Sequence, residues 1–167
     1  MTQRRLNVLF LCTGNSARSI LAEALLGKLG EGRFEAYSAG SQPSGQVQPM
    51  AADLARSLGY PVERLRSKSW DEFAGPGAPS MDIVITVCDN AAGEACPVWL
   101  GHPATAHWGV PDPAAVQGDE DTRRQAYLAA FATLRRRVEL LLALPLEKLD
   151  RLAMQAKLGE IGEVVAR

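Results

Sequence analysis

The stretch that decides the fold is Leu6-Asn7-Val8-Leu9-Phe10-Leu11, followed directly by Cys12-Thr13-Gly14-Asn15-Ser16-Ala17-Arg18-Ser19. A short apolar run that stops at a turn containing glycine is typical of a strand buried in a parallel sheet. Beyond the turn, apolar residues recur at helical spacing, at positions 20, 21, 24, 25 and 29. The sequence therefore predicts a strand, a loop and a helix over residues 6–29.

The same alternation of strands and helices continues along the chain. It argues for an open, mostly parallel α/β sheet with helices on both faces. The long helix near the end carries an apolar stripe and, on its predicted outer face, Arg135, Arg136 and Arg137. The further elements predicted are a strand over Phe34–Ala39, a helix over Pro49–Leu58, strands over Asp82–Val87 and Thr105–Trp108, and the long helix over Tyr127–Leu141.

A break at Pro145 separates the last part of the chain from this pattern. Leu146, Leu149, Leu152 and Ala156 then suggest a further helix, whose apolar stripe docks on the core or on a second subunit. We therefore divide the chain into a domain over residues 1–144 and a C-terminal helical extension over residues 145–167.

Composition limits the classes of function that fit. The 167 residues, 47% of them hydrophobic, are enough for about one domain with a core. A net charge of -1 gives no general attraction to nucleic acid or to an anionic membrane, so any anion chemistry needs a local site. The run Leu6–Leu11 is too short for a membrane span, and Asn7 interrupts it, so a buried strand is favoured over a signal peptide. Three cysteines cannot form a disulfide framework, and we expect a cytoplasmic protein.

The loop after the first strand carries the chemistry. It lies at the carboxyl end of the strand, where open α/β sheets bind their ligands. Cys12 and Arg18, separated by five residues, can close a ring whose backbone N–H groups point inwards and bind a tetrahedral oxyanion at a helix N-terminus. Arg18 adds a bidentate fork. The same donors favour a thiolate at Cys12, to whose sulfur Ser19 can donate. The residues expected to bind the oxyanion are Thr13, Gly14, Asn15, Ser16, Ala17, Arg18 and Ser19.

A simpler interpretation is that Cys12 is a buried core thiol and Arg18 an ordinary surface residue. The complete loop argues against it, because the loop resembles the phosphate loop of low-molecular-weight protein tyrosine phosphatases and of the arsenate reductases that share their fold. This resemblance implies a three-layer α/β fold with a four-stranded parallel sheet in the order 2-1-3-4, flanked by helices. The further matches, which cover most of residues 5–143, are Ser38-Ala39-Gly40, Ser67-Lys68-Ser69-Trp70, Val84-Ile85-Thr86-Val87-Cys88-Asp89 and His107-Trp108-Gly109-Val110-Pro111-Asp112-Pro113.

Two departures favour the reductase branch over the phosphatases. In the phosphatases the aspartate of an Asp-Pro motif protonates the leaving group, and tyrosines usually follow; here Asp112-Pro113 is followed by Ala114-Ala115. The phosphatase loop also commonly carries a second cysteine before its arginine, where this chain has Ala17. A low-molecular-weight phosphatase that hydrolyses phosphomonoesters remains the first alternative. A non-catalytic sensor of an oxyanion or of arsenite is the second.

The other two cysteines fit a reductase, although both could be packing residues. Cys88 directly follows a buried strand and should reach the same sheet edge as Cys12, and Cys96 follows after seven residues. Reduction of As(V) needs one thiol to displace the first sulfur and ideally another to resolve the product. We expect Cys12 to attack arsenic, Asp112 to act as general acid, Cys88 to attack the Cys12 sulfur and Cys96 to attack Cys88.

The expected substrate is arsenate, and phosphate or sulfate can occupy the same loop. Thioredoxin, or glutaredoxin with a small thiol, is the expected electron donor. We expect no cofactor and no metal, because the two histidines do not pair with the cysteines at ligand spacing. His107 and Trp108 are expected to pack or to shape the loop.

Lys68 is a further departure from the relatives. Some thioredoxin-linked reductases resemble this chain but hold a potassium ion near the loop, partly through an acidic residue after a serine. When the sequences are aligned on Ser67, Lys68 takes that position, and Asn15, Glu23 and Ser38 form the remaining site. We expect the ammonium group to replace the ion, and the alternative is a solvated lysine.

Overall fold

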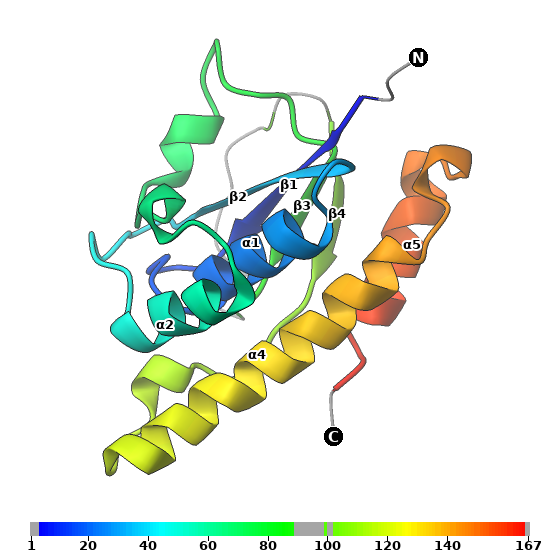
Figure 1. The fold of residues 1–167 in the computed structure, drawn as a ribbon. Coiled ribbons are helices and arrows are strands. Elements are labelled where there is room, and N and C mark those ends of the chain that lie inside the picture. The colour runs from blue at the N-terminus through cyan, green and yellow to red at the C-terminus, as the bar shows by residue number, and fades with distance from the viewer. Residues whose placement is uncertain (1–3, 89–98, 100–101, 166–167) are drawn as a thin grey trace.

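Four parallel strands organise the molecule, shown in the computed structural model of Figure 1, which describes residues 4–88, 99 and 102–165. They are β1 (Leu6–Leu11), β2 (Phe34–Ala39), β3 (Ile83–Thr86) and β4 (Ala104–His107). Their order in the sheet is β2-β1-β3-β4, and every neighbouring pair is parallel. The predicted fold class and strand order are confirmed. β3 is shorter than predicted at both ends, and β4 begins and ends one residue earlier.

The register of the strands brings their carboxyl ends to one edge. Leu11 at the end of β1 pairs with Ala39 of β2 and with Thr86 of β3, and Thr86 pairs with His107 of β4. The residues that follow the strands therefore meet at this edge. Cys12 is among them, and ligands of open α/β sheets bind at such an edge.

The helices begin and end at residues that commonly start or stop helices, and they carry the labels of Figure 1. Pro49 opens α2 and Gly59, in the left-handed region at φ 93°, ends it. The Asp119 carboxylate accepts a hydrogen bond from the Thr122 N–H and caps α4. The α-helices are α1 (Arg18–Leu29), α2 (Pro49–Leu58), α4 (Glu120–Leu142) and α5 (Arg151–Ile161). The short 3-10 turns are η1 (Val62–Arg64), η2 (Trp70–Phe73), η3 (Pro113–Ala115) and η4 (Leu146–Lys148).

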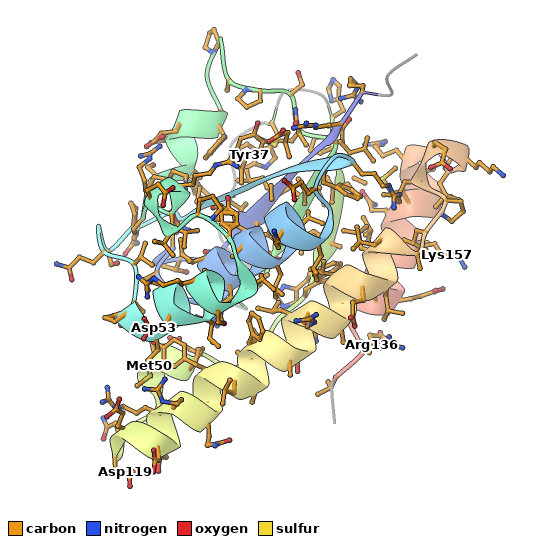
Figure 2. All side chains as sticks on the ribbon, in the orientation of Figure 1. Tyr37, Met50, Asp53, Asp119, Arg136 and Lys157 are labelled. Carbon is orange, nitrogen blue, oxygen red and sulfur yellow. The ribbon has the colours of Figure 1, made fainter. Side chains whose placement is uncertain are left out.

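The central strand is buried on both faces. Val8 and Phe10 belong to the larger core cluster, with side chains of α1 and α4, whereas Leu9 and Leu11 pack on the opposite face with Phe73, Met81 and Trp99. This explains why β1 is a nearly continuous apolar run rather than an alternating one. The side chains between the sheet and the helices are drawn in Figure 2. Within the described residues, no helix has both the length and the apolar composition to cross a bilayer.

The C-terminal helix predicted after Pro145 is present as α5, and it docks on the core beside β4 (Figure 1). The predicted stripe is wrong in part, since Leu152 is 68% exposed and Ala156 is also exposed. Leu158 and Ile161, three residues apart, form the buried face instead. The contact with β4 and Trp108 decides which face is buried, and it cannot be read from the helix alone.

A second correction concerns α4. Arg135 and Arg136 are exposed as predicted, but Arg137 is only 2% exposed. At 100° per residue, Arg137 lies between the buried positions Thr133 and Leu141, four residues away on each side. A run of three arginines around a helix therefore cannot stay on one outer face.

Candidate active site

The loop between β1 and α1 has its carbonyl groups turned outwards. The backbone N–H groups of Gln42, Ser44 and Gln48 donate to the carbonyls of Thr13, Gly14 and Ser16, at 3.0, 2.9 and 2.9 Å. In a trans peptide, a carbonyl and the N–H of the next residue lie on opposite sides. The N–H groups of Gly14, Asn15 and Ala17 are therefore turned towards the inside of the loop. This is the backbone geometry that the predicted oxyanion nest requires.

Asn15 holds the loop in this conformation. Its φ of 46° lies in the left-handed region, which asparagine tolerates better than most residues. The buried side-chain amide donates to the hydroxyls of Ser19 (2.8 Å) and Ser38 (3.0 Å) and accepts from the Lys68 N–H (2.9 Å). One side chain thus connects the loop to α1, to β2 and to the segment before η2.

Gly40 lets the end of β2 approach the loop. A Cβ atom at this position would lie 2.4 Å from the Thr13 carbonyl oxygen and 2.7 Å from that of Cys12. Gly40 also exchanges backbone hydrogen bonds with Lys68 and Trp70, both at 2.9 Å. The glycine of the Ser38-Ala39-Gly40 motif is therefore required by close packing of three backbone segments.

Behind Asn15 lies a buried ion pair. The Lys68 ammonium is 3.8 Å from Glu23 Oε1, and both side chains are less than a tenth exposed. Glu23 also accepts from the hydroxyls of Ser38 (2.5 Å) and Tyr60 (3.0 Å). Burial raises the pKa of Glu23 and lowers the pKa of Lys68, because it disfavours the charged form of each. The Lys68 side chain is thus buried beside Glu23, with its ammonium also donating to the Arg66 carbonyl at 2.9 Å, and the alternative of a solvated lysine is wrong.

Sequence reasoning missed Tyr60 as a member of this cluster. One signal pointed to it. Gly27 lies within α1, and a Cβ atom there would come within 2.7 Å of the Tyr60 ring. A glycine in a helix interior is unfavourable unless packing requires it. Gly27, four residues after Glu23, therefore marks the place where a large side chain packs against α1.

The structure brings Cys88 to the edge of the sheet where Cys12 lies, as expected from its position after β3. The Val87 N–H donates to the Leu11 carbonyl at 2.9 Å and extends the strand pairing by one residue. The Thr13 N–H then donates to the Cys88 sulfur at 3.3 Å. Both cysteines are buried and reduced. Cys96, the third predicted thiol, lies outside the described residues.

The two thiols are close enough to perturb each other. A hydrogen bond with Cys88 is the largest cause that raises the pKa of Cys12, and burial adds to it. The charge of Arg18 and the Gly14 N–H lower it without overcoming the first two effects. The neighbouring thiol and the dry site thus oppose the thiolate that Arg18 and the loop amides favour, and the Cys12 thiolate stays a prediction.

Arg18 and Asp112 are brought together across the loop. Arg18 Nη1 donates to the Val110 carbonyl at 3.1 Å, and Nη2 lies 3.5 Å from Asp112 Oδ2. Asp112 Oδ1 accepts from the Ala114 N–H at 3.0 Å and caps η3. Arg18 Nε is buried and has no hydrogen-bond acceptor within the described part of the chain. A buried N–H without an acceptor is costly, so this group is suited to receive an anion.

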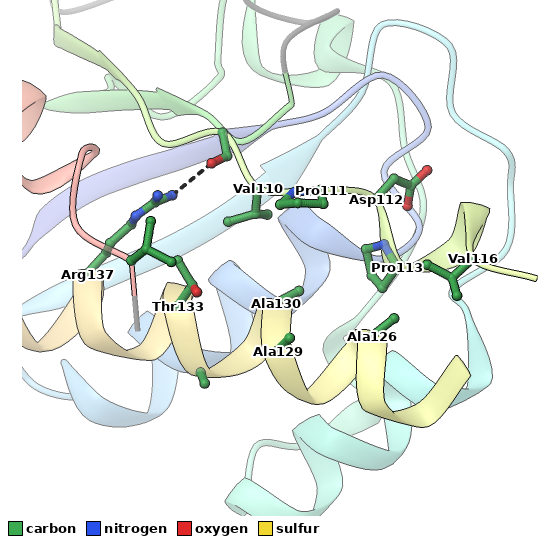
Figure 3. A pocket seen from close by; sticks show the side chains of 13 residues that line it. Val110, Pro111, Asp112, Pro113, Val116, Ala126, Ala129, Ala130, Thr133 and Arg137 are labelled. Atoms are coloured by element: carbon green, nitrogen blue, oxygen red, sulfur yellow. Dashed lines mark hydrogen bonds between the residues drawn. The ribbon is translucent and has the colours of Figure 1, made fainter. Parts of the chain in front are cut away.

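A separate cavity of about 430 Å³ lies between residues Gly109–Pro113, which include Asp112, and helix α4 (Figure 3). Its wall is mostly apolar, with Arg137 at one end. Cys12, Arg18 and Cys88 are not among the residues that line it. The candidate site for oxyanion chemistry is therefore the loop and not this cavity.

Comparison with known proteins agrees with this geometry. The chain is 36% identical over 133 residues to an arsenate reductase 1 of Staphylococcus epidermidis, covering 78% of this chain and 96% of the relative. It is 34% identical over 116 residues to an arsenate reductase of Halalkalibacterium halodurans, covering 70% of this chain and 80% of the relative. The crystal structure of an arsenate reductase from Archaeoglobus fulgidus superimposes with a TM-score of 0.57 at 26% identity, covering 79% of this chain and 98% of that one.

The family assignment rests on a still longer match. The sequence model described as low molecular weight phosphotyrosine protein phosphatase matches residues 7–155. That range contains the Cys12–Ser19 loop, Cys88 and Asp112. The chain therefore belongs to the low molecular weight phosphotyrosine protein phosphatase family.

Proposed function

We propose that this chain is a thiol-dependent arsenate reductase. The observation that carries the proposal is the contact of a second buried thiol, Cys88, with Cys12 and Thr13 of the oxyanion loop. A phosphatase has no use for that thiol, whereas a two-electron reduction needs it. The relatives that are 31–36% identical to this chain are arsenate reductases, which supports the same choice.

The first step forms a bond between sulfur and arsenic. The inward N–H groups of Gly14, Asn15 and Ala17 and the Arg18 guanidinium hold arsenate, which can replace Asp112 as the anion facing Arg18. The Cys12 thiol proton passes to an arsenate oxygen, so that the sulfur attacks arsenic as the thiolate. Asp112 protonates the departing oxygen, and water leaves. Ser19, buried at the start of α1, stabilises the attacking sulfur through its hydroxyl.

The second step transfers two electrons to arsenic. The Cys88 sulfur attacks the Cys12 sulfur, the bond from sulfur to arsenic breaks, and its electron pair moves to arsenic. As(V) becomes As(III), arsenite leaves with the Cys88 proton, and a Cys12–Cys88 disulfide remains. Cys96 then attacks Cys88, which restores the Cys12 thiol and leaves a Cys88–Cys96 disulfide. Thioredoxin, or glutaredoxin with a small thiol, reduces this disulfide from outside.

One assay separates the reductase from its alternatives. Arsenate-dependent NADPH oxidation is measured with the thioredoxin system and with the glutaredoxin system, each supplied alone, and p-nitrophenyl phosphate hydrolysis is measured in parallel. We expect reduction with one donor system, and we expect Cys88→Ser to abolish reduction while it leaves the weak hydrolysis intact. Hydrolysis as the main activity would favour the phosphatase. Stoichiometric binding without turnover would favour the sensor.

A further inference from the structure

The segment Trp108–Asp112 joins β4 to the predicted general acid, and it is held from behind by the last part of the chain. We propose that Arg137 and residues 145–165, here called the C-terminal arm, position this segment so that Asp112 faces Arg18. Arg137 is then a positioning residue. The inference rests on the proposed function, in which Asp112 protonates the departing oxygen.

Arg137 joins the two parts directly. From its buried place on α4, its Nη1 atom donates to the carbonyls of Trp108 (2.8 Å) and Gly109 (3.2 Å), and the second of these bonds is drawn in Figure 3. Its Nε atom donates to the Val164 carbonyl at 2.9 Å. One guanidinium thus connects the beginning of the Asp112 segment to the end of the C-terminal arm.

The arm also grips Trp108. This side chain is fully buried, and its indole N–H donates to the Leu158 carbonyl of α5 at 2.9 Å. At Gly162 the arm comes so close that a Cβ atom would lie 2.3 Å from the His107 carbonyl oxygen and 2.9 Å from Trp108 Cδ1. Arg137 and α5 therefore hold Trp108 in addition to β3, whose Thr86 carbonyl accepts from the Trp108 N–H at 2.7 Å.

Only a short piece of chain separates these anchors from the candidate active site. Val110 and Asp112, which contact Arg18, follow Trp108 by two and four residues. A displacement of Trp108 would therefore reach Asp112 with little slack, since only four peptide units, with three residues between them, can absorb it. Errors of about 1 Å in the position of a reacting group are enough to slow catalysis strongly.

Stability alone does not account for an arginine at this place. Within the described residues, Arg137 forms no ion pair with a carboxylate, and its acceptors there are backbone carbonyls. Burial of a charge costs several kcal/mol of desolvation, and no opposite charge offsets that cost for Arg137 within the described residues. A guanidinium that bridges three carbonyls of two segments does what an apolar side chain cannot, because it fixes their relative position.

The main test is Arg137→Met, with Arg136→Met on the exposed face of the same helix as the matched control (Figure 2). We expect the Arg137 variant to lower kcat about 10- to 100-fold, with KM for arsenate and Kd for inorganic phosphate within about threefold of wild type, because the oxyanion loop is held separately. In an Asp112→Asn background, Arg137→Met should change kcat less than about twofold, since the group it positions is already lost. The proposal would be overturned if kcat of the double variant fell by the product of the two single-variant effects, or if Arg137→Met alone kept the wild-type kcat.

Two further measurements separate a positioning effect from a folding defect and from failure of the proposed function. Gly162→Ala should push the arm away from Trp108 and lower kcat about tenfold, whereas Gly159→Ala, with open space around its Cβ, should leave kcat unchanged. Amide hydrogen exchange over residues 108–112 should rise in Arg137→Met relative to Arg136→Met, and this readout needs no turnover. If wild type does not reduce arsenate but exchange still rises, the proposed function fails while the positioning role stands. If exchange over residues 108–112 is unchanged in Arg137→Met and kcat is unchanged in Gly162→Ala, Arg137 and the C-terminal arm do not position Asp112.

Discussion

At the scale of single residues, the site places two opposing influences on one sulfur. Arg18 and the Gly14 N–H favour a Cys12 thiolate, and the Cys88 thiol and burial favour the thiol. Burial and the Cys88 thiol raise the pKa of Cys12, and the basic oxygens of a bound oxyanion are suited to accept its proton.

Removal of Cys88 should therefore make Cys12 more acidic. In Cys88→Ala, the largest cause of the raised pKa is gone, so the pKa of Cys12 falls and more thiolate is present at a given pH. The rate of Cys12 alkylation by iodoacetamide, followed by peptide mass analysis across pH, should have its midpoint at lower pH than in wild type. Cys12→Ser gives the background. An unchanged or higher midpoint would contradict the assigned cause.

Arg18 should not tolerate its usual replacement. Arg18→Lys keeps the charge but loses the planar fork and the buried Nε–H group, so one ammonium cannot hold two arsenate oxygens. We expect kcat/KM for arsenate to fall about 100-fold or more, on the scale of losing one oxyanion donor. Steady-state kinetics check this, with Arg135→Lys on the exposed side of α4 as control. Near wild-type efficiency would count against the loop as the site.

Sequence reasoning reached some of these residues and not others. Cys12, Arg18 and their loop were accessible because the chemistry needs fixed spacing within eight consecutive residues. Arg137 was placed on the wrong face although its spacing of four residues from Leu141 puts it on the buried side of α4; its carbonyl partners, in Trp108 and Val164, are distant in sequence. The effect of Cys88 on the pKa of Cys12 was not foreseen, since the two cysteines are 76 positions apart in the sequence.

At the scale of elements, the bounds of strands and helices could be predicted from glycine and proline positions. The buried face of a helix could not, because tertiary contacts select it. The bounds of β2 and α2 agree with the prediction, because Gly40, Pro49 and Gly59 mark their ends. The bounds of α5 were approximate, and its buried face was wrong because β4 and Trp108 select it. The buried pair of Glu23 on α1 and Lys68 before η2 is likewise a contact between elements, and it leads to two predictions.

The first is a pH dependence of stability. Burial, opposed by Lys68, Ser38, Tyr60 and Arg64, raises the folded pKa of Glu23 above its unfolded value of about 4.3. The folded protein then binds this proton more tightly than the unfolded chain, so the Glu23 contribution is full below that pH and is lost as the pH rises through the folded pKa. A glutamine at position 23 does not titrate, so the stability of Glu23→Gln carries no such pH-dependent contribution.

Urea unfolding between pH 4 and pH 8 measures this contribution. The free energy of unfolding of Glu23→Gln minus that of wild type should become more positive as the pH rises, whereas Glu31→Gln, at an exposed position, should show no such trend. A difference that stays flat or falls would mean that the partners of Glu23 outweigh its burial.

The second concerns potassium. The Lys68 ammonium already lies 3.8 Å from the Glu23 carboxylate and donates to the Arg66 carbonyl at 2.9 Å, so a monovalent cation would have to compete with a charge fixed to the chain. We expect arsenate reduction to be the same in potassium and in sodium buffers of equal ionic strength. In Lys68→Met, potassium should restore part of the lost activity. Strong potassium activation of wild type would refute the replacement.

At the scale of the whole molecule, the sheet gathers thiols that are distant in sequence, and the order of the relay can be tested. Cys12 and Cys88 meet because β1 and β3 are neighbours and end together, and Cys96 follows Cys88 after seven residues. A disulfide requires the Cα atoms of its cysteines to come within about 7 Å, which seven intervening residues permit.

We therefore predict that one arsenate turnover without donor leaves wild type with a Cys88–Cys96 disulfide. Cys96→Ser should accumulate Cys12–Cys88, and Cys88→Ser should stop at the Cys12 adduct. Peptide mass mapping after a single turnover distinguishes these states. If wild type yields only Cys12–Cys88, or a mixed disulfide with an added small thiol, Cys96 is a bystander and the donor is of the glutaredoxin type.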